Sequence, residues 1–441
     1  MCIEMEKESI AVVGGGILGI TAAMELAKTG KYKVTLFEKD NKLGGLSTFY
    51  RWNDVICDRF YHVILPTDSY LLEFIDEIGL ESQILWRSVK SGFFGKGRLI
   101  SLSSVQDFVF FPFLSLWQKF QLGLGILYSS RIKKTEKLDN LSANQWLSKV
   151  FGKAVFEKVW EPLLRSKFGR ATDTISASFM QAVISRLYGT RSKSKKQEKM
   201  GHVMGGYYSI LKNIHQKLTE LNVDLKINTT VKNVNLENGR NIFLKTDTET
   251  LRFNKLLLTI PCPEVIKIVN DFPSDKYWQR LKEWEYLGII CVMVILQKKL
   301  SPYYVINLLD SKFPFTGIIE STNVISSQDV GGNNIVYLPK YVNQDDPINN
   351  FSDEQITVLF IDNLKKIFSN LHGNKVLHTE VFREKYVQPL QKVGYQEQNI
   401  SINTPQKNVY LVNSTMITDS TLNNNAIIKL ARRTVQTISD S

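Results

Sequence analysis

A glycine-rich turn between a short apolar strand and a helix is the feature that most restricts how this chain can fold. Residues 10–13 are all apolar and predict a buried strand, after which Gly14, Gly16 and Gly19 have the spacing of a dinucleotide-binding turn. Such glycines allow a tight reversal, a close approach of the backbone to a pyrophosphate, and close packing of the next helix. Residues 17–28 supply that helix, whose N-terminal N–H groups and dipole favour an anion.

A second predicted strand brings an acid to the same edge of the sheet. Residues 33–37 form this strand, which ends at Glu38 and is followed by Lys39. In dinucleotide-binding folds, a carboxylate at this position accepts hydrogen bonds from the adenosine ribose. A lone glycine motif is a weak signal, but the strand–helix–strand frame and the acid together predict a nucleotide site.

A pair of glycines follows the acid, where a plain NAD-binding domain would usually start another helix. Gly44 and Gly45 lie at the centre of this segment, residues 42–48. With this pair, the N-terminal region resembles the flavin amine oxidase superfamily, which includes monoamine oxidases, protoporphyrinogen oxidases, phytoene desaturases and UDP-galactopyranose mutases. There, the paired glycine after the ribose-binding acid lets the backbone pass close to FAD. The resemblance therefore implies FAD as the cofactor.

The resemblance also assigns FAD contacts to particular positions. They fall in the two glycine loops, at the acid, in a segment that crosses the flavin, beside the adenine, and near the start of the last helix. The expected contacts are Gly14, Gly15, Gly16, Leu18, Gly19, Glu38, Lys39, Gly44, Gly45, Leu46, Ser47, Thr48, Arg59, Tyr61, Val231, Asn413, Ser414, Leu422 and Asn423.

The order of segments resembles the same superfamily along almost the whole chain. This implies an α/β fold in which a Rossmann-like FAD-binding domain is joined to a discontinuous α+β substrate domain. The FAD-binding domain is expected at residues 1–75, 196–265 and 396–441, and the substrate domain at residues 76–195 and 266–395. A chain of 441 residues with 43% hydrophobic residues is long enough for two such domains.

Cysteine usage and the N-terminal residues bear on metal sites and on the compartment. Cys2, Cys57, Cys262 and Cys291 lie far apart without a CxxC pair, which predicts neither a metal site nor a disulfide framework. The polar, acidic start of the chain does not resemble a signal peptide. We therefore expect a cytoplasmic protein, with peripheral membrane association as the alternative.

An aromatic and basic stretch is the reason to consider peripheral membrane association. Residues 105–128 are rich in phenylalanine, but polar residues interrupt them before a membrane-spanning length is reached. The net charge is +12, and Arg131, Lys133 and Lys134 contribute to it. The stretch is either a helix and pocket wall of the substrate domain or, over residues 105–137, a surface that enters one leaflet. No recognition motif accompanies the charge, so nucleic acid is not an expected partner.

Residues 52–64 form a strand-like segment that, by resemblance, crosses the flavin ring. His62 is the strongest candidate for a side chain facing the isoalloxazine, where an imidazole can tune the flavin or move a proton near neutral pH. A satisfied core histidine is the other interpretation. Arg59 either contacts phosphate, flavin or a substrate carboxylate, or pairs with a local acid such as Asp58.

A second candidate catalytic residue follows a long apolar strand. Residues 287–296 are almost all apolar and lead into Lys298 and Lys299. Because amine oxidases place a flavin-facing lysine after a comparable strand, the resemblance makes either lysine a candidate for holding a water against flavin N5. A charged surface turn is the other interpretation.

The C-terminal segment departs from the superfamily. Most members have Gly-Asp after the last strand and Gly-Ala where the final helix opens, whereas this chain has Asn413-Ser414 and residues 423–425, which are all asparagine. Amide and hydroxyl groups still hydrogen-bond a cofactor, and asparagine is a favourable helix N-cap. The departure predicts that FAD is held here by unconventional contacts.

Three functions fit these features. The first is an FAD-dependent oxidoreductase that takes a hydride from a C–N or C–C bond of a small-molecule or lipid-linked substrate, with an electron acceptor that the sequence leaves unidentified. The second is a redox-neutral isomerase of a nucleotide sugar or another glycan precursor, which His62 and the positive charge favour. The third is a non-catalytic partner with an FAD-type fold.

Overall fold

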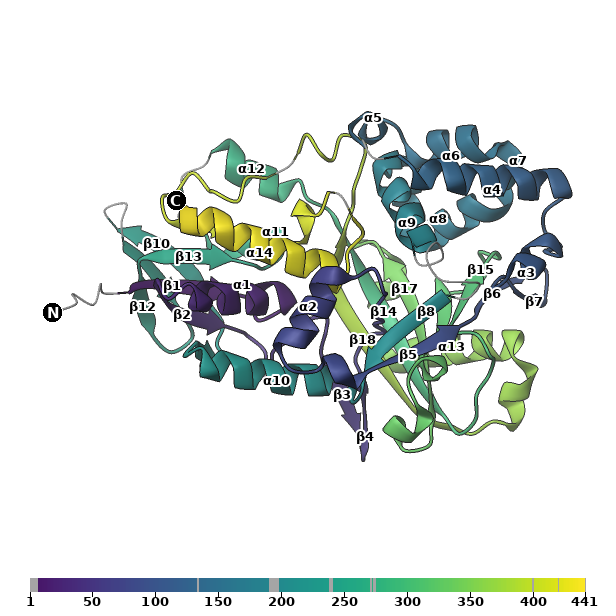
Figure 1. Ribbon diagram of the computed structural model, residues 1–441, viewed down its shortest axis with the longest axis horizontal. Helices are drawn as coiled ribbons and strands as arrows, with labels where there is room; N and C mark the ends of the chain where they lie inside the picture. Colours follow the sequence, from purple (N-terminus) through teal and green to yellow (C-terminus); the bar gives the residue numbers. More distant parts are fainter. Residues whose placement is uncertain are drawn as a thin grey trace.

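Two large β-sheets organise the chain, and Figure 1 shows them side by side. This computed structural model describes residues 7–132, 135–189, 198–237, 241–269, 272, 275–398, 400–418 and 420–440. Cys2, Lys133 and Lys134 lie outside the described residues. The chain passes between the two sheets several times, so each sheet contains strands that are far apart in sequence.

A five-stranded parallel sheet carries the N-terminal glycine loop, with the order β19-β13-β1-β2-β9. In chain order these strands are β1 (Glu8–Val13), β2 (Tyr32–Phe37), β9 (Asp224–Lys226), β13 (Lys255–Leu258) and β19 (Val409–Leu411). Val12 on the central strand lies opposite both Leu36 and Leu257, and all three are buried. A parallel sheet covered in this way needs near-continuous apolar strands, which explains the run at residues 10–13. The Rossmann-like fold predicted from the sequence is confirmed.

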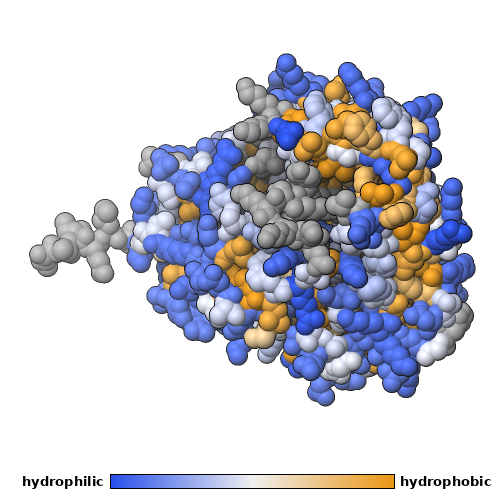
Figure 2. Space-filling model, turned by 45° about the vertical axis from the view of Figure 1, so that its right-hand side comes forward, coloured by the Kyte–Doolittle hydropathy of each residue, from blue (hydrophilic) through white to orange (hydrophobic). Residues whose placement is uncertain are grey.

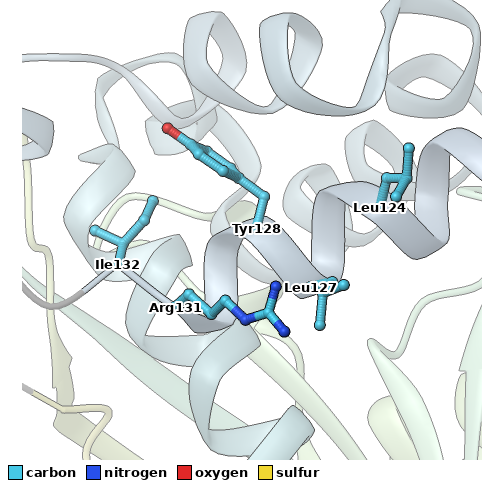
Figure 3. A pocket seen from close by; sticks show the side chains of 5 residues that line it. All are labelled: Leu124, Leu127, Tyr128, Arg131 and Ile132. Atoms are coloured by element: carbon cyan, nitrogen blue, oxygen red, sulfur yellow. The ribbon is translucent and has the colours of Figure 1, made fainter.

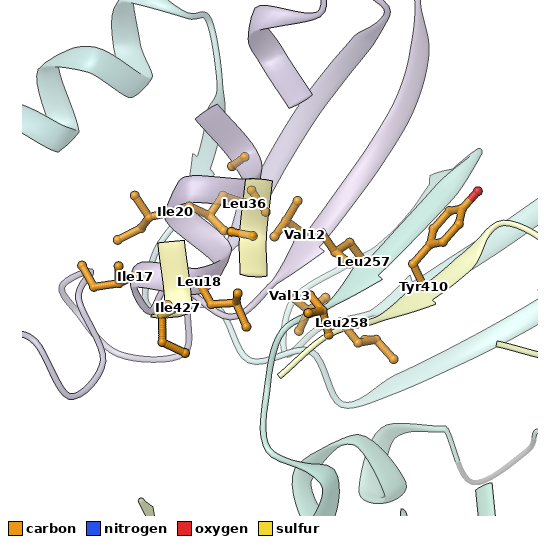
Figure 4. Close-up of a cluster of buried hydrophobic side chains, with 14 of the residues drawn as sticks. Val12, Val13, Ile17, Leu18, Ile20, Leu36, Leu257, Leu258, Tyr410 and Ile427 are labelled. Carbon is orange, nitrogen blue, oxygen red and sulfur yellow. The ribbon is translucent and has the colours of Figure 1, made fainter. Parts of the chain in front are cut away.

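Helices and a small antiparallel sheet cover these strands. The helix α1 (Ile17–Lys28) contacts β1 and β2 as well as α14 (Asn424–Asp440) and α10 (Gly206–Glu220). Figure 4 shows Leu18 and Ile20 of α1 within the buried cluster that also contains Leu36. Strands β10 (Asn233–Glu237), β11 (Asn241–Lys245) and β12 (Thr250–Phe253) add a three-stranded sheet, and the Phe253 ring meets the Phe37 ring edge-on at 5.9 Å.

The second sheet has seven strands in the order β18-β14-β17-β16-β15-β6-β7. The strands are β6 (Ser91–Gly95), β7 (Arg98–Ser101), β14 (Tyr286–Leu296), β15 (Val305–Leu308), β16 (Gly317–Glu320), β17 (Asn334–Val342) and β18 (Val376–Pro389). Strands β6 and β15 pair in parallel, and the other neighbours pair antiparallel. This mixed sheet agrees with the α+β substrate half of the predicted fold.

Strand β14 is buried on both faces, which explains its continuous apolar run. Alternate side chains of a strand point to opposite faces of its sheet. The even-numbered residues from 290 to 296 pack with the helix α13 (Asp353–Ile367). The odd-numbered residues from 289 to 295 pack with the hairpin of β3 (Phe49–Trp52) and β4 (Val55–Asp58).

A block of helices, at the upper right of Figure 1, packs beside the seven-stranded sheet around its own buried cluster. Its helices are α3 (Val105–Val109), α4 (Leu116–Ser130), α5 (Glu136–Asp139), α6 (Ala143–Phe151), α7 (Lys153–Val155), α8 (Glu161–Phe168) and α9 (Ala177–Gly189). In α4, Leu122 is buried whereas Trp117 and Phe120 are exposed. The stretch at residues 105–128 is therefore a core helix on one side and open surface on the other. Among the described residues, no helix has the length and apolar composition needed to cross a bilayer.

The segment predicted as a strand over residues 52–64 is extended only as far as Asp58, where β4 ends. The chain then leaves the hairpin, and the Arg59 N–H donates to the Thr48 carbonyl at 2.9 Å. At its far end Ile64 pairs with Gly201 in β8 (Glu198–Val203), which itself pairs with β5 (Ile84–Val89). Residues 59–63 belong to no strand, and the contacts of Arg59 and Ile64 with other segments hold their two ends.

Candidate functional site

The first glycine loop leaves open space above the N-terminus of α1. The Gly14 N–H donates to the Phe37 carbonyl at 2.9 Å, which fixes the turn on β2. A Cβ on Gly19 would collide with the Gly14 carbonyl, so glycine is required for this close helix packing. By contrast, a Cβ on Gly16 would meet none of the described atoms within 4 Å. Because Gly16 also begins α1 without a side-chain cap, uncapped N–H groups border a space that suits a phosphate.

Glu38 lies at the end of β2, as expected for a ribose-binding acid. Its Oε2 accepts the Gly15 N–H at 2.7 Å, and its Oε1 accepts the Asp40 N–H at 2.9 Å. Burial raises the pKa of the Glu38 carboxyl, more than these hydrogen bonds lower it. The Thr229 N–H donates to the Glu38 carbonyl, which brings the nearby, buried Val231 to the same edge of the sheet.

The second glycine loop packs directly on the first. The Gly44 N–H donates to the Gly15 carbonyl at 2.8 Å, and Gly44 forms a parallel bridge with Gly16. A Cβ on Gly45 would lie 3.2 Å from the Gly16 Cα, so the absence of side chains permits the approach. The Thr48 hydroxyl is buried and lacks a hydrogen-bond partner among the described residues. A cofactor that crosses both loops supplies such a partner.

These two loops fit FAD. A dinucleotide needs space and N–H donors for its pyrophosphate, and an acid for its ribose. The structure provides the space at Gly16, the acid at Glu38, and an additional unpaired hydroxyl at Thr48. It brings these groups together from positions separated by up to 32 residues in the printed sequence.

Ser47 joins the second glycine loop to two remote parts of the chain. Its Oγ lies 3.4 Å from Nε2 of His62 and accepts from Nδ2 of Asn424 at 3.0 Å. The same Asn424 Nδ2 donates to the Tyr207 hydroxyl. The His62 and Tyr207 rings meet edge-on, with their centroids 4.8 Å apart. The start of α14, the start of α10 and the crossing segment therefore meet at Ser47.

His62 is held as a neutral imidazole. Its Nδ1 lies 2.9 Å from the Phe60 carbonyl, an acceptor that requires the proton on Nδ1. The other nitrogen, Nε2, is then an acceptor for the Ser47 hydroxyl. Burial lowers the pKa of His62, although the Asp58 carboxylate opposes this shift. With both ring nitrogens engaged, the side chain positions the Ser47 loop.

Asp58 organises the neighbouring turn, a role that the sequence reasoning missed. Its carboxylate accepts the Tyr207 N–H at 2.8 Å and lies 3.5 Å from Nε2 of His202. A Cβ on Gly206 would collide with that carboxylate, so the glycine permits the approach. The Tyr337 hydroxyl donates to the Asp58 carbonyl, which joins β17 to β4. In the sequence, the run Gly205-Gly206-Tyr207 is the pattern that could have indicated a close contact at this turn.

Arg59 pairs with Glu384 of β18, and not with Asp58 as one interpretation of the sequence had it. Its Nη1 lies 2.7 Å from Oε1 of Glu384, and its guanidinium lies 5.6 Å from the centre of the Phe382 ring. Asp58 is already bound by the turn before α10. The ion pair links residues 59–63 to the seven-stranded sheet.

Tyr61 belongs to a group of tyrosines beside this segment, of which Tyr337 is buried and Tyr61 and Tyr341 are half-buried. Its ring centre lies 6.2 Å from that of Tyr337, and its hydroxyl makes a side-chain hydrogen bond with Tyr341. Burial raises the pKa of each of the three hydroxyls above its usual value. They therefore remain protonated near neutral pH and act as neutral hydrogen-bonding groups.

A lysine from the helical block joins these tyrosines. Lys167 of α8 places its Nζ 5.3 Å from the centre of the Tyr341 ring, and it also lies over the rings of Phe168 and Phe179. No carboxylate of the described residues lies within 4.0 Å of this ammonium group. Burial lowers the pKa of Lys167 to about 8. No local pattern in the sequence indicates this residue, because Phe179 and Tyr341 come from α9 and β17.

Lys298 lies in the exposed turn after β14. Its N–H donates to Oδ1 of Asn374 at 3.0 Å, and Nζ of the neighbouring Lys299 donates to Oδ1 of Asn323 at 3.2 Å. The side chain of Lys298 is exposed, and its position agrees with a charged surface turn.

The asparagines of the C-terminal segment bind the chain itself. The Asn413 Nδ2 donates to the Ile260 carbonyl at 3.1 Å, and its Oδ1 accepts from the N–H and hydroxyl of Thr415. This side chain is therefore used within the protein, where the resemblance implied a cofactor contact. Asn423 caps α14, because its Oδ1 accepts the Ala426 N–H at 3.0 Å. The prediction of an asparagine helix cap is confirmed.

The remaining expected contacts differ in their exposure. Leu18 is buried in the core of the parallel sheet, and Lys39 is exposed. Leu46, Ser414 and Leu422 are half-buried. Leu46 and Leu422 pack against the two hydrophobic clusters on either side of the glycine loops.

Comparison with solved structures supports the fold. The chain is similar to a putative protoporphyrinogen oxidase from Exiguobacterium sp. 255-15, with a TM-score of 0.77 over 98% of this chain and 99% of that one, at 18% identity. At this level of identity, the likeness establishes the architecture alone.

Comparison with curated proteins gives weaker but consistent matches. The chain is 22% identical over 306 residues to coproporphyrinogen III oxidase of Staphylococcus aureus, covering 62% of this chain and 65% of that protein. It is 26% identical over 300 residues to carotenoid phi-ring synthase of Streptomyces griseus, covering 62% of this chain and 56% of that protein. The matches span less than two thirds of these relatives.

Residues 19–422 match the family described as flavin containing amine oxidoreductase. This range includes the second glycine loop, residues 59–63, the seven-stranded sheet and every strand of the parallel sheet except β1. Together with the two glycine loops and the acid, it establishes FAD as the cofactor. The chain belongs to the family of flavin containing amine oxidoreductases.

Proposed function

We propose that this FAD-dependent oxidoreductase oxidises a C–C bond of an apolar or anionic, lipid-like substrate to C=C, in preference to the C–N bond of a protonated amine. One carbon would lose a hydride to the bound FAD, and its neighbour would lose a proton to solvent. The observation that carries the proposal is Lys167, an ammonium group that lies over aromatic rings without a carboxylate partner among the described residues. A protonated amine beside this group would be repelled, whereas a carboxylate or an apolar chain would not. The names of two relatives, a coproporphyrinogen oxidase and a carotenoid ring synthase, agree with this choice.

The residues around Lys167 orient such a substrate. Tyr61 and Tyr341 offer neutral hydroxyls and ring faces, and the buried Tyr337 packs behind Tyr61. When bound, FAD supplies the acceptor for the two electrons of the hydride. The protein contributes positioning and exclusion of water, which account for much of catalysis in such sites. The reduced cofactor requires an electron acceptor, for which oxygen, a quinone and another carrier are the classes to compare.

Flavin absorbance under anaerobic conditions tests this proposal. Purified enzyme is mixed with a carotenoid precursor, a porphyrinogen carboxylate or a series of primary and secondary amines. We expect bleaching of the oxidised flavin by the first or second class and none by the amines. Bleaching by amines alone would overturn the choice of substrate. Turnover of a nucleotide sugar only after prior reduction of the flavin would favour the redox-neutral isomerase instead.

Substitution of Lys167 separates the substrate class from the general activity. Lys167→Met keeps the length and apolar stem of the side chain but removes its charge. We expect this variant to retain bleaching by an uncharged polyene and to lose much of its response to a carboxylate. Equal loss with both substrates would show that Lys167 supports the fold or the cofactor and not the substrate.

A further inference from the structure

Large apolar side chains gather on the outer surface of α3 and α4, and Figure 2 shows hydrophobic surface on the side of the molecule that carries this helical block. We call this surface the α4 face, and it is exposed to an unusual degree. The exposed fractions are Phe110 80%, Leu116 76%, Trp117 66%, Phe120 54%, Leu124 50% and Tyr128 58%. Single exposed apolar residues are ordinary, but a contiguous group of this size marks an interaction surface.

Helix geometry places these residues on one side of α4. Trp117, Phe120, Leu124 and Tyr128 are three or four positions apart, which is the spacing of one helix face. The opposite side is fixed to the body of the protein. A Cβ on Gly125 would lie 2.5 Å from the Phe151 ring, so this side of α4 packs closely on α6. The helix therefore cannot turn its apolar face inward.

Positive charge surrounds the α4 face. Lys119 lies within it, and Lys158 of the adjacent turn donates to the Gln118 side chain at 3.0 Å. Asp107 is the acidic residue of the described segment 105–132, and its carboxylate accepts hydrogen bonds from the Ser101 hydroxyl and the Ser103 N–H. These hydrogen bonds lower its pKa and engage the charge locally. The net charge that this surface presents to a partner is positive.

A shallow groove of about 370 Å³ continues the surface at the C-terminal end of α4. Figure 3 shows its lining, in which one guanidinium accompanies four largely apolar side chains. The lining residues are Leu124, Leu127, Tyr128, Arg131 and Ile132. An apolar groove edged by a guanidinium matches a lipid molecule, whose acyl chain is apolar and whose headgroup phosphate is anionic.

We propose that the α4 face docks on the surface of an anionic lipid bilayer, with α4 lying parallel to the membrane plane. A helix of 15 residues is about 22 Å long, and its other side packs in the hydrophobic cluster of the helical block, so it suits the interface and not a crossing. Trp117 and Tyr128 lie near its two ends, and both residue types favour the boundary between headgroups and acyl chains. The adjacent cations add attraction for anionic headgroups.

Vesicle flotation with the FAD-loaded enzyme tests this proposal. Vesicles of phosphatidylcholine alone are compared with vesicles that also contain phosphatidylglycerol, and the flavin absorbance reports the protein in each fraction. We expect binding to the anionic vesicles that weakens as salt is raised. The double variant Trp117→Glu/Phe120→Glu should reduce the bound fraction by about tenfold or more. A wild-type enzyme that stays with neither type of vesicle would overturn the proposal.

A matched control uses exposed apolar residues elsewhere. Phe351, which is 41% exposed, lies just before α13, and Val358, which is 60% exposed, lies within it. The variant Phe351→Glu/Val358→Glu adds the same charge to another surface and should bind vesicles like the wild type. Equal loss in both variants would show that net charge, and not the α4 face, decides binding. Unchanged flavin content in both variants shows that each is folded.

A second copy of the chain is the competing occupant of the α4 face. Sedimentation velocity without lipid measures this directly. We expect a monomer, or an oligomer that the Trp117→Glu/Phe120→Glu variant leaves intact. A wild-type dimer that dissociates in this variant would show that the α4 face is a protein interface, and it would overturn the membrane proposal.

Discussion

Single residues decide whether the first loop of the chain can hold a phosphate. A side chain at Gly16 would project into space that none of the described atoms occupy within 4 Å, and the φ of −72° at this position suits valine. We therefore expect Gly16→Val to lose FAD while the protein still folds. Flavin absorbance after purification measures the loss, and thermal unfolding of the FAD-free proteins, equal within about 1 kcal/mol, checks the fold.

Gly123 provides the control for this substitution. It lies in α4, and a Cβ on it would also meet none of the described atoms within 4 Å. Gly123→Val therefore adds the same side chain at a position outside the glycine loops and should keep full flavin. If Gly16→Val kept full flavin as well, the phosphate would have to bind elsewhere.

His62 gives the protein a pH-dependent stability. Burial lowers its pKa in the folded protein below the ordinary value of 6.5, while the unfolded chain keeps that value. The unfolded state therefore takes up a proton first as the pH falls, so the His62 contribution is complete above pH 6.5 and declines below it. We expect His62→Gln to reduce the loss of the thermal unfolding midpoint on acidification, whereas the exposed His215→Gln should not. Identical acid profiles for all three proteins would contradict a neutral, buried His62.

The residues of the site differ in how far the sequence could predict them. Gly16 and Glu38 belong to a short local pattern whose chemistry follows from the spacing, and the role of Gly44 was implied by the family resemblance. The partners of Ser47 are different, because Asn424 is 377 positions away and the contact depends on how the whole chain folds. No local pattern encodes such a pair, and the same reason explains why Glu384 was missed as the partner of Arg59.

Among the elements, α14 depends on a single cap at its N-terminus. Asn423 accepts the Ala426 N–H, so Asn423→Ala leaves that donor without its partner. We expect a loss of about 1 kcal/mol in the free energy of unfolding, and Asn423→Asp should restore most of it. Urea unfolding measures both values. Because Asn424 donates to Ser47, the Ala variant should also hold FAD more weakly, and unchanged flavin affinity would separate the cap from the site.

Elements were predictable where one physical requirement fixed their pattern. Strand β14 is buried on both faces, so its unbroken apolar run identified it directly. The aromatic stretch of α4 satisfies two requirements, because one side packs on α6 and the other is exposed. Composition alone cannot separate these sides, which is why both interpretations of residues 105–128 remained open from the sequence.

At the scale of the whole molecule, Lys167 connects parts that neither sheet contains alone. The lysine comes from the helical block, Tyr341 from the seven-stranded sheet and Tyr61 from the segment that follows the β3–β4 hairpin. If a substrate binds at this point, as we propose, its recognition requires all three parts to be assembled. The pKa of Lys167 depends on its burial among these three parts, so a titration of this lysine reports whether they are assembled.

The pKa of Lys167, about 8, sets a direction for the dependence of substrate binding on pH. The ammonium group is charged below this value and neutral above it, so KM for a carboxylate substrate should rise as the pH passes through about 8. Lys167→Met should give a flat profile, with KM raised roughly 30-fold at neutral pH for the loss of about 2 kcal/mol of charge-assisted binding. Lys298→Met, in an exposed turn, should keep the wild-type profile. If Lys298→Met removed the pH dependence and Lys167→Met did not, the lysine after β14 would be the group that meets the substrate, and the assembly around Tyr341 would serve only the fold.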